Sequence, residues 1–187
     1  MEFSDLANSI ATNWPIWAVT TFLIVGAVID GVELRVPNWL TLPMVAAGWI
    51  YSTTCFGWDG LAWSLVGTGV GLGLLLPAYA IGGMGAGDVK MLAAVGAWVY
   101  GWNTFYAFCA STIVGAVIAV IMVLCSGRIQ KHYNQFMVIF TEILTLRDPE
   151  KLATIAADRK PSMMLLPYGI PIAIGTIGYF CWTGLLI

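Results

Sequence analysis

The sequence predicts an all-α integral membrane protein with about six transmembrane helices, and composition carries this prediction. Hydrophobic residues make up 59% of the 187-residue chain and charged residues only 10%, whereas a soluble domain carries about 25% charged residues. The mean hydropathy is +0.85, so there are too few charges to cover a surface exposed to water. A formal net charge of -2 leaves no basic footprint for a nucleic acid.

The positions of the spans follow from the apolar runs, because a helix needs about 20 apolar residues to cross about 30 Å of hydrocarbon. Three spans are expected near 10–29, 39–56 and 61–81. The apolar run 91–125 is too long for one crossing at about 1.5 Å per residue, and Gly101-Trp102-Asn103 offers a break into a short fourth and a long fifth span. A sixth is expected over 163–187. Five spans with a re-entrant fourth segment are the main alternative.

The basic residues predict the orientation of this topology. All eight Lys and Arg residues fall in loops 30–38, 82–90 and 126–161, on one side of the six-span arrangement, while the other side holds only acids such as Asp59. Basic loops are retained in the cytoplasm. We therefore expect the three basic loops to face the cytoplasm and the two termini to lie outside.

The long loop between the fifth and sixth predicted spans has a helical pattern of its own. Apolar side chains recur every three or four residues, at Ile129, Tyr133, Phe136, Met137, Phe140, Ile143 and Leu144. This spacing predicts an amphipathic helix lying in the inner membrane interface. Asp148-Pro149 predicts the N-cap and first position of a second short helix that ends near Asp158. A membrane-surface connector is the favoured interpretation, and a docking surface for a substrate or partner is the alternative.

Glycines are spaced in the third predicted span so as to favour close helix packing. Gly67, Gly69, Gly71 and Gly73 form two overlapping G-x-x-x-G patterns, and such small residues let helix backbones approach one another. A hinge for substrate entry is the alternative interpretation.

Two acidic residues stand at the ends of apolar spans, where a carboxyl group is a functional candidate. Asp30 ends the first span and Asp88 opens the fourth. Two crossings separate them, so both lie at the same membrane face whichever way the chain is inserted. Two carboxyl groups brought within a few ångströms share one proton. One can then act as general base on water while its protonated partner polarises a carbonyl.

Structural roles also fit each of these residues taken alone. Asp30 could solvate a helix end or pair with Arg35, and Asp88 could be the N-cap of the fourth span, with Gly85 and Gly87 as turn residues. Lys90 could lower the pKa of Asp88 or anchor the chain at the interface.

Three motifs in order resemble those of the type IV prepilin peptidases. Residues 30–41 (DGVELRVPNWLT) resemble the first motif, an Asp followed by a segment containing Pro37 and Asn38. Residues 85–90 (GAGDVK) match the G-x-G-D-x-K motif, and residues 167–173 (PYGIPIA) resemble the signature of the final span. The resemblance implies an aspartic endopeptidase that removes the short, basic leader of prepilins and pseudopilins at the cytoplasmic membrane face.

The resemblance also implies roles for individual residues. Asp30 and Asp88 would be the catalytic pair, and the supporting or substrate-binding residues would be Gly85, Gly87, Lys90, Pro37 and Asn38. It implies no metal and no organic cofactor. The expected partners are prepilin substrates, membrane lipid and other components of pilus assembly or secretion.

The departures from the longer bifunctional members of that family are informative. Those members carry an N-terminal insert with two C-x-x-C pairs and also N-methylate the mature pilin. Here the four cysteines, at 55, 109, 125 and 181, form no such pair. Residues 1–187 are therefore expected to be a single membrane-embedded peptidase domain without methyltransferase activity, resembling the short form associated with Flp/Tad pili.

Two alternatives come from other functional classes. The first is an ion- or proton-coupled transporter that uses the two aspartates as a relay, although transporters usually place such acids near the membrane midplane within repeats. The second is a non-catalytic scaffold for pilus assembly, in which both aspartates would be dispensable. The single histidine, His132, is expected to have a surface role.

Overall fold

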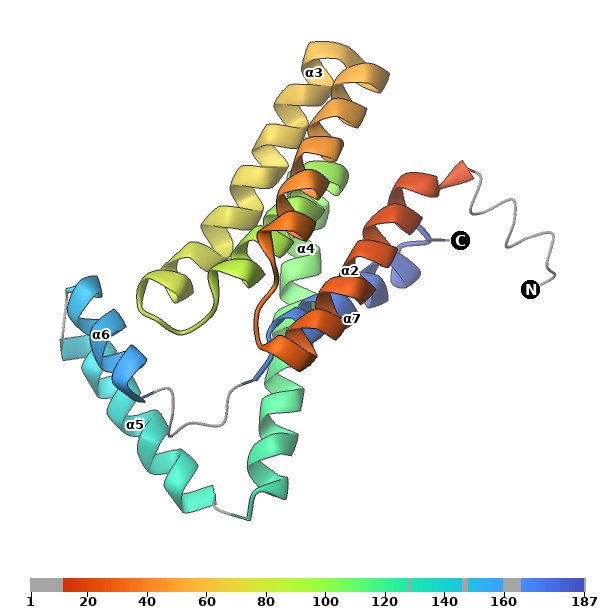
Figure 1. Ribbon diagram of the computed structural model, residues 1–187. Coiled ribbons are helices and arrows are strands. Elements are labelled where there is room, and N and C mark those ends of the chain that lie inside the picture. Colours follow the sequence, from red (N-terminus) through yellow and green to blue (C-terminus); the bar gives the residue numbers. More distant parts are fainter. Residues whose placement is uncertain (1–11, 128, 146–147, 160–165, 187) are drawn as a thin grey trace.

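The computed structural model describes residues 12–127, 129–145, 148–159 and 166–186. Every regular element in these residues is a helix, as predicted (Figure 1). In chain order the helices are α2 (Trp14–Glu33), α3 (Asn38–Ala80), α4 (Ala86–Cys125), α5 (Ile129–Thr145), α6 (Pro149–Arg159) and α7 (Gly169–Trp182). Helices α2, α3 and α4 are each long and apolar enough to cross a membrane, and α7 is a shorter apolar helix.

Helix α3 is a hairpin of two helical segments. Its backbone leaves the helical conformation at Gly57, where φ is 65° and ψ is -149°. Figure 1 shows the chain reversing direction within α3, so that the two segments run antiparallel. The two segments pack side by side, since the indole Nε1 of Trp49 donates a hydrogen bond of 3.0 Å to Thr68 Oγ1. The break falls between the second and third predicted spans.

Helix α4 is interrupted in the same way. The break is at Tyr100, where φ is 64°, one residue before the predicted Gly101-Trp102-Asn103 sequence. Asn103 Nδ2 donates to the Val99 carbonyl oxygen at 3.0 Å and so satisfies an acceptor beside the break. Both interruptions lie where the sequence predicted the chain to turn, and the number of membrane crossings stays a prediction.

Helix α7 is shorter than the predicted sixth span. The expected range was 163–187, but the helix comprises the 14 residues Gly169–Trp182, and residues 160–165 and 187 lie outside the described structure. At about 1.5 Å per residue such a helix is about 21 Å long, less than the hydrocarbon core. Pro167 and Tyr168 precede its first turn, and Gly184, with φ 68°, follows its end. It packs against α4 and α2.

The first segment of α4 is the centre of the molecule. Met91, Leu92, Ala94 and Val95 are fully buried there. The second segment of α3 packs directly against it, because a side chain at Gly67 would strike the carbonyl oxygen of Gly96 and one at Gly71 would lie 2.6 Å from that of Leu92. Gly69 and Gly73 face open space. The predicted role in close helix packing is therefore confirmed for Gly67 and Gly71 but not for Gly69 and Gly73.

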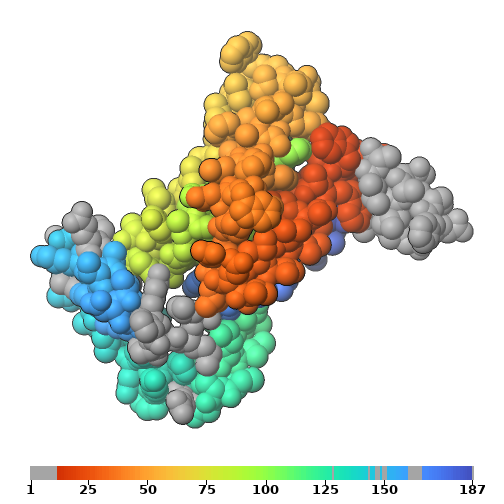
Figure 2. Space-filling view, in the orientation of Figure 1, coloured from red at the N-terminus to blue at the C-terminus, as the bar shows by residue number. Residues whose placement is uncertain are grey.

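Helices α5 and α6 form an arm that projects from this body (Figure 2). An ion pair joins them, with Arg159 Nη2 2.6 Å from Glu142 Oε1. Helix α6 contacts the body at Gly82, where an added Cβ would lie 2.8 Å from that of Ala156. Its start at Pro149 is as predicted, and its last residue is one beyond the predicted end.

Helix α5 presents the predicted apolar face without cover from the other residues that the structure describes. The face residues whose side chains are described are all more than a third exposed: Ile129, Tyr133, Phe136, Met137, Phe140 and Leu144. The Ile143 side chain lies outside the description. An uncovered apolar face on a membrane protein is what an interfacial helix requires, and its position in the membrane stays a prediction.

Candidate active site

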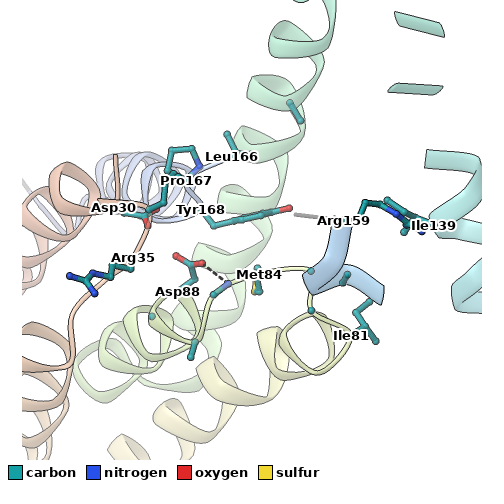
Figure 3. A pocket seen from close by; sticks show the side chains of 18 of the residues that line it. Asp30, Arg35, Ile81, Met84, Asp88, Ile139, Arg159, Leu166, Pro167 and Tyr168 are labelled. Atoms are coloured by element: carbon teal, nitrogen blue, oxygen red, sulfur yellow. Dashed lines mark hydrogen bonds between the residues drawn. The ribbon is translucent and has the colours of Figure 1, made fainter. Parts of the chain in front are cut away.

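The structure brings Asp30 and Asp88 to one cavity. Asp30 lies in the last turn of α2 and Asp88 in the first turn of α4, and the exposed fractions of these residues are only 3% and 5%. Both line a cavity of about 900 Å³, and their charges are close enough to interact. Figure 3 shows the two carboxyl groups directed into this space, with Tyr168 beside them.

The backbone of α7 holds the carboxyl group of Asp30. The Gly169 N–H, at the first helical residue of α7, donates a hydrogen bond of 2.7 Å to Asp30 Oδ2. Arg35 does not pair with Asp30, because its Nε lies 3.0 Å from Oε2 of Glu33 instead. The predicted alternative of an Asp30–Arg35 pair is therefore wrong.

The carboxyl group of Asp88 has one held oxygen and one unpaired oxygen. Gly85 is the N-cap of α4, and its N–H donates to Asp88 Oδ2 at 3.2 Å. Asp88 thus stabilises the helix start from the third helical position, rather than from the N-cap position itself. Among the described residues, Asp88 Oδ1 is buried without a hydrogen-bond partner. A buried unpaired carboxyl oxygen is costly, and it is suited to bind a water or a substrate atom.

Glycine at position 87 lets the Asp88 segment approach the segment that precedes α3. An added Cβ at Gly87 would lie 2.7 Å from the Val36 carbonyl oxygen and 2.8 Å from its nitrogen. Both contacts are with backbone, which cannot move aside as a flexible side chain would. Pro37, in an extended conformation, then caps the start of α3.

Lys90 and Asn38 form a second connection between the same two segments. Lys90 Nζ donates a hydrogen bond of 2.8 Å to Asn38 Oδ1. The ammonium group is therefore directed at the first residue of α3. Both side chains line the cavity.

The far side of the cavity is built by elements to which the sequence assigned no catalytic role. The arm contributes Phe136, Ile139, Glu142, Leu152, Ala156 and Arg159. The hydrogen bond from Arg159 holds the pKa of Glu142 below its usual range, so this carboxylate stays ionised in its pair. His132 also lines the cavity and is half-buried.

Tyr168 forms the wall beside the aspartates. Burial, and then the nearby charge of Asp88, raise the pKa of the Tyr168 phenol, so it is a neutral group at neutral pH. Sequence reasoning recognised residues 167–173 as a motif without giving any of them a task. A role for Gly169 could have been inferred from its position, since the N–H groups at the start of a helix have no acceptor within that helix.

The described part of the chain contains no cluster of three or more His, Cys, Asp and Glu side chains that could hold a metal ion. What it offers is a pair of buried carboxyl groups, one of them with an unpaired oxygen, at the end of a helical bundle. Fold and site thus define a helical membrane protein with a two-carboxylate cavity.

The family follows from comparison with known sequences. The model of the type IV leader peptidase family matches residues 17–120, which is more than half of the chain and includes both aspartates. The chain belongs to this family. No solved structure matches it.

Two relatives are both named prepilin leader peptidase/N-methyltransferase. The protein from Neisseria gonorrhoeae is 32% identical over 117 residues, covering 59% of this chain and 41% of the relative. The protein from Aeromonas hydrophila is 29% identical over 136 residues, covering 67% of this chain and 46% of the relative. The chain therefore matches less than half the length of each.

Proposed function

We propose that this protein is a membrane aspartic endopeptidase that cleaves the leader from prepilins or pseudopilins of the Flp type. The observation that carries the proposal is the meeting of two buried carboxyl groups in one cavity. They come from different helices, and each lies in one of the motifs that resemble the family. Membership of the leader peptidase family supports the same substrate class.

In the proposed mechanism Asp30 and Asp88 share one proton. The ionised carboxylate takes a proton from a water as the water oxygen attacks the scissile carbonyl carbon, while the protonated partner donates a hydrogen bond to the carbonyl oxygen. The tetrahedral intermediate then collapses, the C–N bond breaks, and the leaving amine takes up the proton that the carboxylate had removed from the water. The unpaired Oδ1 of Asp88 is a suitable acceptor for the water.

The supporting residues would fix the separation of the two carboxyl groups. Gly85 holds one Asp88 oxygen, Gly87 allows the close approach at Val36, and the Lys90–Asn38 hydrogen bond joins the segments that carry the dyad. Correct placement of reacting groups contributes strongly to rate, since a displacement of about 1 Å can cost about 100-fold.

The active site is proposed to face the cytoplasm at the bacterial inner membrane, with both termini outside. In the described residues, Arg35 and Lys90 line the cavity, and Arg159 lies on the arm that closes it. Asp59 lies next to the Gly57 turn, at the far end of α3 from the cavity. This distribution agrees with retention of basic loops in the cytoplasm.

The proposal is tested by co-reconstitution with a candidate prepilin in liposomes. Asp30→Asn and Asp88→Asn should each abolish cleavage without loss of membrane insertion, because Asn is nearly isosteric but cannot exchange the proton. Asp59→Asn is the matched control and should cleave normally. Normal cleavage by Asp30→Asn would exclude the aspartyl mechanism and reopen the transporter and scaffold alternatives.

The same assay separates cleavage from methyl transfer. These 187 residues have no C-x-x-C pair, and we propose that they cleave without N-methylating the product. Mass spectrometry of the mature N-terminus should show the mass of the unmodified residue when S-adenosylmethionine is present. A mass increase of one methyl group would contradict this part of the proposal.

A further inference from the structure

The start of α7 contributes a backbone donor to the dyad. Gly169 is the first helical residue, and the first N–H groups of a helix have no acceptor within it. The next donors are already used locally, since the N–H of Ile170 bonds to the Pro167 carbonyl and that of Ile172 to the Tyr168 carbonyl. The Gly169 N–H is therefore available to Asp30, and it forms the 2.7 Å bond to Oδ2.

No side chain fits at position 169 without moving Asp30. An added Cβ would lie 2.9 Å from both Cβ and Oδ2 of Asp30 and 3.1 Å from its Cγ. Cβ atoms essentially never approach other heavy atoms that closely. Since Asp30 itself is buried, it has little room to retreat. The absence of a side chain is thus required here for contact with a carboxyl group rather than for a turn.

The two aspartates are held in parallel ways. In each case a glycine N–H at a helix start donates to one carboxyl oxygen, Gly169 of α7 to Asp30 and Gly85 of α4 to Asp88. The positive end of a helix dipole also favours a negative group at these positions. One oxygen of each carboxyl group is fixed, which leaves the other for reaction.

We propose that Gly169 is a positioning residue for the reaction, acting through Asp30. The inference rests on the proposed aspartyl function. Gly169 lies outside the family match over 17–120, and neither the sequence motifs nor the comparisons assign it a task. Helix α7 is accordingly part of the active site as well as a packing element against α2 and α4.

Three glycines of α7 provide a matched kinetic test. Gly169→Ala should lower kcat by about 100-fold, with KM changed by less than about twofold, because the carboxyl group is displaced. Gly175→Ala should lower Tm, since its Cβ would strike the backbone of Ser111, and Gly178→Ala should be neutral, because nothing lies within 4 Å. Normal kcat in a folded Gly169→Ala protein would overturn the inference.

A spectroscopic measurement on the unmodified protein keeps the inference testable if Gly169→Ala fails to fold. In protein labelled with ¹⁵N-glycine, the Gly169 amide resonance should shift with pH as Asp30 ionises, because its proton is bonded to that carboxyl group. The shift should vanish in Asp30→Asn, while the Gly178 resonance stays constant in both proteins. A Gly169 resonance that does not shift over the pH range in which the enzyme cleaves prepilin would contradict the proposal.

The two proposals fail in different ways. If Asp30→Asn cleaves normally, the aspartyl function is wrong whatever Gly169 does. If Asp30→Asn is inactive but Gly169→Ala cleaves at the normal rate, only the role of Gly169 is wrong.

Discussion

Glycine serves two different purposes in two regions of this molecule. Along the contact between α3 and α4, Gly67, Gly71 and Gly96 let the helix backbones touch. At the cavity, Gly85 and Gly169 use their N–H groups to hold carboxyl oxygens. The first group removes side-chain volume between two helices, whereas the second brings a polar donor to a buried charge.

The difference teaches that one residue type can carry stability in one region and activity in the other. A side chain added between α3 and α4 separates two apolar surfaces and costs packing energy. A side chain added beside the aspartates would displace a carboxyl group and, under the proposed mechanism, lower the cleavage rate. Substitution of glycine by alanine therefore distinguishes the two regions, provided that Tm and kcat are both measured.

The largest expected effect on folding is at Gly67. Gly67→Ala would place Cβ 2.8 Å from the Cα of Tyr100 and against the Gly96 carbonyl oxygen, and such overpacking costs about 1–3 kcal/mol or more. Gly69→Ala, two residues away, faces open space and should be neutral or slightly stabilising. Thermal unfolding in detergent measures both, and equal Tm values for the two variants would refute the close helix contact.

The next largest effect is expected at Gly87, which allows a close backbone contact, like Gly67, but lies beside the aspartates, like Gly169. Gly87→Ala should push the Val36 backbone away from Asp88 and reduce the cleavage rate by about 100-fold. Gly73→Ala is the control, since nothing lies within 4 Å of its added Cβ. Cleavage is followed by gel shift of reconstituted prepilin. A Gly87→Ala protein with the normal rate would show that the Val36 contact does not set the dyad geometry.

The smallest effect is expected at Lys90. Lys90→Met keeps an unbranched stem but removes the hydrogen bond to Asn38, so the cleavage rate should fall by about three- to tenfold. Asn38→Ala should have a similar effect. The double variant should be no slower than either single one, because both remove the same bond. Additive losses would mean that the two residues act separately.

Much of this arrangement is predictable from the sequence. Composition predicts a helical membrane protein, and the breaks at Gly57 and Tyr100 lie within a few residues of the predicted turns. The spacing of acids at span ends selects Asp30 and Asp88. These features depend on local composition and on the order of the apolar segments along the chain, and both can be read from the sequence.

The remaining features depend on contacts between distant residues. The Gly169–Asp30 hydrogen bond joins positions 139 residues apart, and no local pattern specifies which helix start meets which carboxyl group. The G-x-x-x-G spacing also predicts the same packing role for Gly67 and Gly69, although only Gly67 faces α4. The predicted sixth span starts near 163, outside the described residues, and the described helix begins at Gly169, after Pro167.

The central claim is that Asp30 and Asp88 act as one catalytic unit, and the residual activity of the double variant tests it most directly. Initial cleavage rates are measured for Asp30→Asn, Asp88→Asn and the combined variant in the same liposomes, with sensitivity down to the uncatalysed rate. The account predicts that the double variant is no slower than either single one, because residues that act as a unit are not additive. A double variant slower than both singles by the product of their separate losses would contradict it.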